Sequence, residues 1–110
     1  MHDIKPGDFL VETLVTDSVG YFVTKTSAKS IWVVPAHRTA ITKGESNGSP
    51  YPVVLTAIEA PVDTADERRL GIRKGGLFKT ASWARPLRPA PTADFGDEGV
   101  RPYVRTDYSY

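Results

Sequence analysis

The chain of 110 residues contains no cysteine, only one methionine and only two histidines, His2 and His37. Disulfides and thiolate metal sites are therefore excluded, and two histidines cannot complete a closed zinc site without other ligands. We accordingly expect no metal site and no cofactor. The lack of cysteine also gives no reason to place the protein in an oxidising compartment.

Long apolar runs are missing as well. No stretch approaches the roughly 18 apolar residues that a membrane-spanning segment needs. The N-terminal residues include Asp3 and Asp8 and form no apolar signal sequence. These absences predict a soluble, cytoplasmic protein that makes no contact with a membrane.

The chain has almost no excess of charge, because 14 Lys and Arg residues oppose 13 Asp and Glu residues for a formal net charge of +1. The distribution is uneven, however. Residues 68–88 hold seven Lys or Arg residues and no acid, whereas residues 1–67 hold five against nine acids and residues 89–110 two against four. The near-neutral total conceals a basic segment, which is a candidate binding surface.

Residues with a branched Cβ atom are abundant. Val, Ile and Thr make up 27 of the 110 residues and fall into short stretches separated by turn residues, a pattern that favours strands. We expect strands over residues 9–15, 21–25, 30–34 and 53–60, and a weaker one over 38–42. Thr64 and Glu67 match the capping-box spacing, which predicts one helical turn. The chain is therefore predicted to be all-β.

Residues 70–73 and 77–82 predict a hairpin around Lys74, Gly75 and Gly76. A two-residue loop would place charged residues opposite apolar ones on both faces of this hairpin. A three-residue loop pairs Ile72 with Phe78 and avoids the conflict, so we expect that register. With Lys74 at the tip, the cations expected to point to solvent together are Arg69, Arg73 and Lys79.

The end of the chain, residues 89–110, is rich in proline and tyrosine and has little periodicity. Aromatic side chains are unfavourable in water, so we expect this extension to dock on its own barrel or on a neighbouring molecule. The aromatic residues expected to make that contact are Phe95, Tyr103, Tyr108 and Tyr110.

No catalytic residues are predicted. The chain has no GxSxG motif, and the acids near residue 64 are explained by the predicted turn. Lys74-Gly75-Gly76 lacks the spacing of a phosphate-binding loop. A hydrolytic enzyme would become a hypothesis again only if His37 were buried beside a serine and an acid. We therefore expect a protein that is not an enzyme.

The two tryptophans are interpreted differently. Trp32 lies between Ile31 and Val33, so we expect it to close the core at one end of the barrel. Trp83 is close to Arg85, and an exposed aromatic residue near an arginine is typical of binding hot spots. Trp83 is therefore the predicted contact residue.

The stretch GDFLVETLVTDSVGYFVTKTSAKSIWVV, residues 7–34, resembles the opening of small uncharacterised proteins encoded by actinobacterial phages and prophages. RRLGIRKGGLFKTASWARPLRP, residues 68–89, resembles their late hairpin and proline-rich end more loosely. The chain lacks the aromatic Gly-Tyr-Asp loop that many of those proteins carry after the first strand. The resemblance implies an SH3-like barrel, a phage origin and a location in the host cytoplasm or in a virion, and implies no activity.

Together these observations predict a small antiparallel SH3-like barrel over residues 1–88 with an extended C-terminal segment over residues 89–110. An immunoglobulin-like sandwich is the alternative, although the strands are few and short for two sheets. The predicted function is non-catalytic binding of a protein partner or of further copies of the chain, as a virion or assembly component would require. Nucleic-acid binding by residues 68–88 is the alternative. The residues predicted to form the binding surface are Arg69, Arg73, Lys74, Lys79, Trp83 and Arg85.

Overall fold

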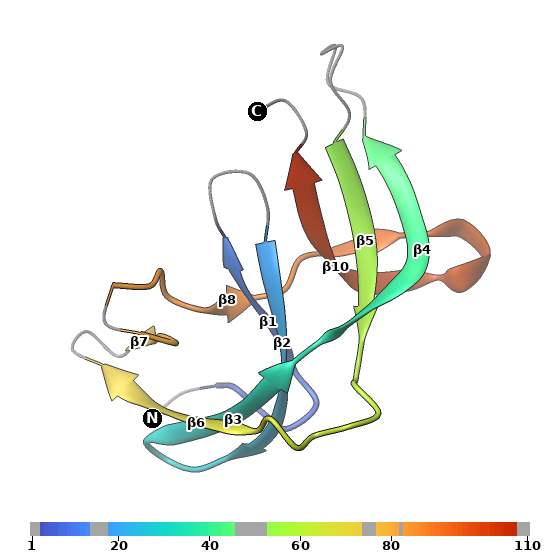
Figure 1. The fold of residues 1–110 in the computed structure, drawn as a ribbon. Coiled ribbons are helices and arrows are strands. Elements are labelled where there is room, and N and C mark those ends of the chain that lie inside the picture. Colours follow the sequence, from blue (N-terminus) through green and yellow to red (C-terminus); the bar gives the residue numbers. More distant parts are fainter. Residues whose placement is uncertain (1–2, 14–17, 46–52, 74–76, 82, 108–110) are drawn as a thin grey trace.

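The computed structural model describes residues 3–13, 18–45, 53–73, 77–81 and 83–107. Within these ranges the protein is built from antiparallel strands, and the only helical element is one 3-10 turn (Figure 1). The predicted all-β class is confirmed. The elements are β1 (Phe9–Thr13), β2 (Ser18–Thr26), β3 (Ser30–Pro35), β4 (His37–Glu45), β5 (Val53–Glu59), β6 (Arg68–Arg73), β7 (Leu77–Phe78), β8 (Arg88–Pro89), β9 (Thr92–Asp94), η1 (Gly96–Glu98) and β10 (Val100–Asp107).

Six of the strands form a curled antiparallel sheet in the order β7-β6-β3-β2-β1-β8. Its two edges approach each other, because the backbone N–H of Leu87, just before β8, donates a hydrogen bond of 2.9 Å to the carbonyl oxygen of Phe78 in β7. The curvature of this sheet is consistent with the small β-barrel that the sequence predicts (Figure 1).

The inner face of the curled sheet carries the larger hydrophobic cluster. Strand residues alternate between the two faces, so one residue in two points inward along each strand. Ile4, Tyr21 and Ile72 pack against the cluster from its margins. The buried members are Leu10, Val23, Ile31, Val33, Leu70, Phe78 and Leu87.

A second sheet, in the order β4-β5-β10-β9, stands beside the first (Figure 1). The chain passes directly from β3 into β4 through Ala36, so one long strand path belongs to both sheets. The sheets approach closely at Gly20 of β2, where an added Cβ atom would lie 3.1 Å from side-chain atoms of both Ile58 and Val104. Glycine is the residue that permits this approach. Val11, Ile58 and Val104 form the hydrophobic cluster at the junction.

Residues 89–107 fold back onto the rest of the chain. The last strand, β10, lies inside the second sheet between β5 and β9, and the first residue of the extension, Pro89, pairs with Leu10 as part of β8. Val104 of β10 is only 1% exposed. The segment that composition marked as an extension therefore supplies an inner strand of the second sheet.

The predicted hairpin register is confirmed where the hairpin exists. Ile72 pairs with Phe78 and Arg73 with Leu77, as a three-residue loop requires. The second strand ends at Phe78, however, because the chain then crosses toward β8. The predicted helical turn near residue 64 is a hydrogen-bonded turn, in which the Thr64 carbonyl oxygen accepts the N–H of Glu67 at 3.2 Å and the Asp63 carboxylate accepts the N–H of Ala65 at 2.8 Å.

The remaining predicted strands are present with shifted ends. Those predicted over residues 21–25, 30–34 and 38–42 lie within β2, β3 and β4, and residues 53–59 of the stretch predicted over 53–60 form β5. β5 lies between β4 and β10 and is therefore an inner strand, as its apolar sequence suggests.

Candidate binding surfaces

A row of three side chains crosses the outer face of the curled sheet. Trp32 of β3 is paired in register with Lys25 of β2 on one side and Arg69 of β6 on the other. The Lys25 ammonium lies 4.5 Å from the centre of the Trp32 ring, and the Arg69 guanidinium lies 5.9 Å from it. Both distances permit cation–π attraction, so the row is a preformed cationic and aromatic surface.

The prediction that Trp32 closes the core is wrong. Ile31 and Val33 point into the barrel, so Trp32 between them lies on the opposite face, where it is half-buried. The run of apolar residues in β3 did not indicate which face is inside. Lys25 was missed because its contact with Trp32 depends on the register of a hairpin that contains a bulge after Val23.

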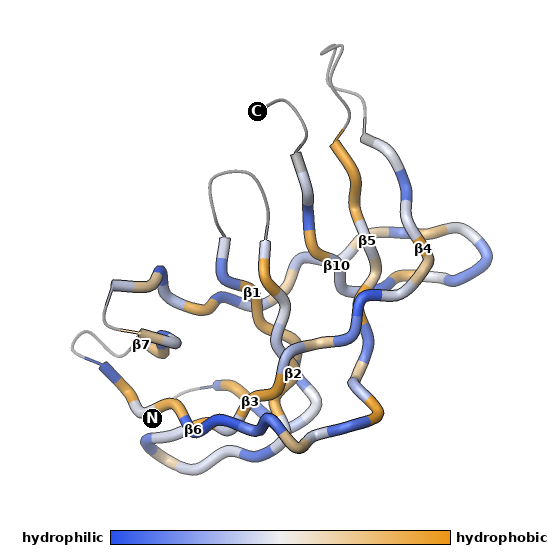
Figure 2. Tube along the Cα trace, in the orientation of Figure 1, coloured by the Kyte–Doolittle hydropathy of each residue, from blue (hydrophilic) through white to orange (hydrophobic). Residues whose placement is uncertain are grey.

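The predicted basic surface is divided in the structure. Arg69 and Arg73 are exposed at alternate positions of β6 and therefore share its outer face, in a stretch whose N-terminal end is strongly hydrophilic (Figure 2). Lys79 is partly buried and lies beyond β7, on the path toward β8. Lys74 lies outside the described residues.

Trp83 and Arg85 lie on the segment that connects β7 to β8. The indole of Trp83 is 86% exposed, and Arg85 is exposed as well. Ala84 between them is buried, and its N–H donates a hydrogen bond of 3.0 Å to the carbonyl oxygen of Ala81. The segment is thus anchored through Ala84 while the aromatic side chain is presented to solvent.

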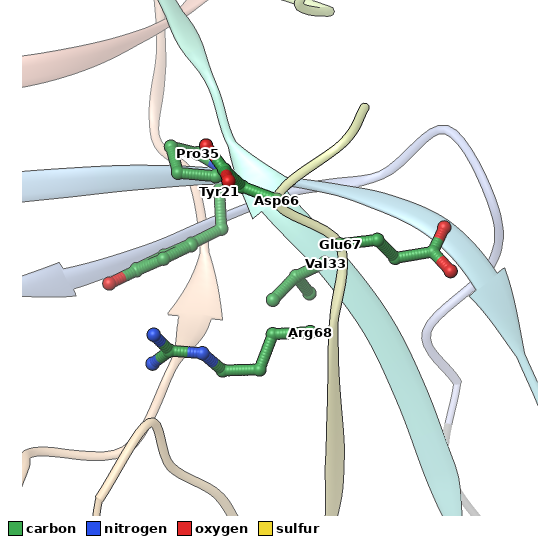
Figure 3. Close-up of a pocket in the computed structure, with 6 residues that line it drawn as sticks. All are labelled: Tyr21, Val33, Pro35, Asp66, Glu67 and Arg68. Carbon is green, nitrogen blue, oxygen red and sulfur yellow. The ribbon is translucent and has the colours of Figure 1, made fainter. Parts of the chain in front are cut away.

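One rim of the curled sheet holds a hollow of about 450 Å³, lined by both polar and apolar residues (Figure 3). The Tyr21 ring and the Arg68 side chain extend toward the same side of it, over Val33, whereas the Glu67 carboxylate points the other way (Figure 3). Glu67 accepts a hydrogen bond of 2.6 Å from the Thr24 hydroxyl. Arg68 forms no salt bridge with any residue in the described ranges.

Glu12 is buried near this rim, with the Thr80 hydroxyl donating a 3.3 Å hydrogen bond to its carboxylate. Burial, and secondly the negative charge of Glu12, raise the pKa of the Tyr21 phenol above its ordinary value, while the positive charge of Arg68 acts in the opposite direction. The effect of this shift is confined to alkaline pH, because an ordinary tyrosine is already protonated at neutral pH.

The raised pKa of Tyr21 predicts how stability changes in alkali. A phenol whose pKa is higher in the folded state holds its proton more firmly there, so its contribution is complete below about pH 10 and is lost as the pH rises through the folded-state pKa. The free energy of unfolding of the native protein should therefore fall more steeply above about pH 10 than that of Tyr21→Phe. Urea unfolding followed by circular dichroism at several alkaline pH values measures both slopes, and parallel curves would contradict the assignment.

The second sheet carries its own charged and aromatic contacts. Glu59 lies 3.8 Å from His37 and 3.5 Å from Arg101. The rings of Phe95 and Tyr103 pack edge to face with their centres 6.5 Å apart, so these two of the aromatic residues that were expected to dock contact each other. Tyr108 and Tyr110 lie outside the described residues.

His37 lies on the surface of the second sheet, beside the Glu59 carboxylate. Its side chain is 61% exposed, and it forms no hydrogen bond with a serine of the described ranges. No group of three or more potential ligand side chains that could hold a metal ion occurs in the part of the chain that the structure describes. Within the same residues, no helix is long and apolar enough to cross a membrane.

Comparisons with family models, with curated proteins and with solved structures find no match to this chain.

Proposed function

We propose that the protein is a non-catalytic binding protein that acts through protein–protein contacts, with Trp83 at the centre of the contact. The observation that supports this proposal is the 86% exposure of the Trp83 indole on a segment anchored through buried Ala84. A large aromatic side chain left in water is unfavourable for a protein alone, and tryptophan and arginine are the residues that contribute most at protein interfaces.

The surroundings of Trp83 favour an acidic partner. Arg85 and Arg88 are both exposed, and together with Pro86 and Thr13 they line a small hollow near the start of β8. Opposite charge on the partner would speed association and select against basic proteins.

The same proposal includes a phage origin and a role in a virion or in its assembly. It also includes a location in the host cytoplasm or in the virion. They are supported by the sequence resemblance of residues 7–34 and 68–89. The described part of the C-terminal extension pairs within its own chain, so an assembly contact is better assigned to Trp83 than to a C-terminal arm.

Capture of partners from the natural host tests the proposal. Tagged native protein, Trp83→Ala and Val62→Ala are compared, because Val62 is a fully exposed apolar residue outside the proposed contact. A partner identified by mass spectrometry should be recovered with the native protein and with Val62→Ala, and about 30-fold more weakly with Trp83→Ala, as expected for a hot-spot residue. Recovery of the same proteins in the same amounts with Trp83→Ala would contradict the proposal.

The row Lys25–Trp32–Arg69 favours a second candidate function, binding of single-stranded nucleic acid. Aromatic rings on a sheet surface can stack bases while neighbouring cations contact phosphates. A fluorescent single-stranded oligonucleotide should bind the native protein at low salt, with an affinity that decreases as salt increases. Arg69→Glu combined with Arg73→Glu should abolish this binding, whereas Lys43→Glu on the second sheet should not. Absence of binding at low salt would remove this candidate.

A further inference from the structure

A second surface of the chain complements Trp83. A hollow of about 410 Å³ opens where the N-terminal segment meets the start of the C-terminal extension, at the junction of the two sheets. Its volume falls within the range of about 300–1,000 Å³ that is usual for pockets that hold compact ligands. Its lining residues include Asp3, Asp8, Phe9, Pro89, Thr92 and Pro102.

The walls of this hollow, which we call the junction hollow, are mostly apolar. Phe9 is partly buried and packs against Phe22, with ring centres 5.1 Å apart and ring planes tilted by 53°, so one wall is an aromatic surface. Pro89 and Pro102 add rigid apolar surface from β8 and β10. Aromatic and proline side chains of this kind provide good contacts for an indole ring, which itself buries about 150–250 Å².

The charges of the junction hollow are negative. Asp3 and Asp8 are the only charged residues among the described residues that line it. Asp8 is held in place, because its carboxylate accepts a hydrogen bond of 2.8 Å from the backbone N–H of Lys5. A basic residue close to an inserted aromatic ring would therefore be attracted to this rim.

We propose that the junction hollow of one molecule binds the Trp83–Arg85 segment of a second copy of the same chain. The indole of Trp83 enters the apolar hollow, and the Arg85 guanidinium lies near Asp3 and Asp8 at its rim. This inference rests on the proposed function and names the partner of the same Trp83 contact. Both halves of the contact are present in every molecule, and Trp83 does not occupy the hollow of its own chain, since its indole is exposed.

The contact joins two different surfaces, so it is heterologous. Each molecule offers one protruding tryptophan and one hollow, and a contact of this type allows further copies to add until a ring closes or a filament forms. A contact that propagates in this way is typical of a component of a larger assembly.

Light scattering after size-exclusion chromatography, combined with mixing of two variants, tests the inference. Trp83→Ala removes the protruding side chain and leaves the hollow, whereas Thr92→Arg fills the hollow from an exposed position and leaves Trp83. The average mass of the native protein should increase with concentration up to about 1 mM, the weak end of ordinary affinities. Each variant alone should associate about 30-fold more weakly than the native protein.

An equimolar mixture of the two variants should form a one-to-one complex, because the intact hollow of Trp83→Ala can accept the intact tryptophan of Thr92→Arg. Val62→Ala is the control and should associate like the native protein. The inference is overturned if the native protein stays monomeric at about 1 mM, if Trp83→Ala associates like the native protein, or if the mixture stays monomeric. Monomeric native protein that still captures a host partner through Trp83 would overturn this inference while leaving the proposed function intact.

Discussion

Replacing Val104 by aspartate is expected to unfold the protein or to lower its free energy of unfolding by about 4 kcal/mol or more, because it buries a carboxylate that has no partner. Val104 is 1% exposed and lies in the cluster that joins the two sheets. A domain of this size has about 5–15 kcal/mol of stability, so the loss is a large part of the total. Circular dichroism during urea unfolding measures it.

The matched control is Val100→Asp, which makes the same change in the same strand at a residue that is 70% exposed. This variant should stay within about 0.5 kcal/mol of the native protein. Equal stability of the two variants would show that β10 is not an integral strand, and that the C-terminal segment is the appendage that its composition suggests.

Phe78→Ala should lower the free energy of unfolding by about 3–5 kcal/mol, the usual effect of removing a buried phenylalanine. Phe78 is 4% exposed in the core of the curled sheet, and its carbonyl oxygen accepts the hydrogen bond from Leu87 that links the two edges of that sheet. The substitution therefore removes core packing at the place where the barrel closes. Thermal and urea unfolding give the size of the effect.

Trp83→Ala removes a larger aromatic residue from the segment that follows β7 and serves as the comparison. Because Trp83 is exposed, its removal should change stability by no more than about 0.5 kcal/mol. The two variants thus separate folding from binding, because Phe78→Ala should lower the free energy of unfolding and Trp83→Ala should weaken binding. A loss of stability in Trp83→Ala similar to that in Phe78→Ala would mean that the indole is part of the core.

The parts of the fold that follow local rules could be predicted from the sequence. Branched residues and turn residues indicated the strands. The hairpin register followed from the need to place apolar Ile72, and not charged Arg73, opposite apolar Phe78. In β1, by contrast, both faces are used, with Leu10 in the barrel core and Val11 at the junction. Periodicity alone does not distinguish a strand of this kind from one with a solvated face.

The last strand was hidden by its composition. Pro102 cannot donate a backbone hydrogen bond, and prolines are usually confined to strand edges and bulges, so a proline-containing stretch does not indicate a strand. The structure accommodates Pro102 in the register of β9 with β10, opposite Thr92. Pairing with β5, a contact between residues far apart in sequence, is what makes β10 a strand, and no local signal carries that information.

Among the binding residues, too, some could be predicted from the local sequence and others depend on contacts between residues far apart in the chain. Exposed Trp83 was predicted from its position near Arg85, whereas the junction hollow combines residues 3–10 with residues 89–102 and exists only in the folded chain. Likewise, the cationic row around Trp32 depends on the pairing of three strands. The sequence therefore identified Trp83, one side of the proposed contact, whereas the junction hollow on the other side could be identified only from the fold.

The most direct test of the central claim, that Trp83 of one molecule docks in the junction hollow of another, is a series of amide correlation NMR spectra recorded at increasing protein concentration. We predict shifts confined to two regions, residues around Trp83 and the residues that line the hollow, and their absence in Trp83→Ala. Spectra that do not change with concentration, or changes centred on the row Lys25–Trp32–Arg69 instead, would contradict the account.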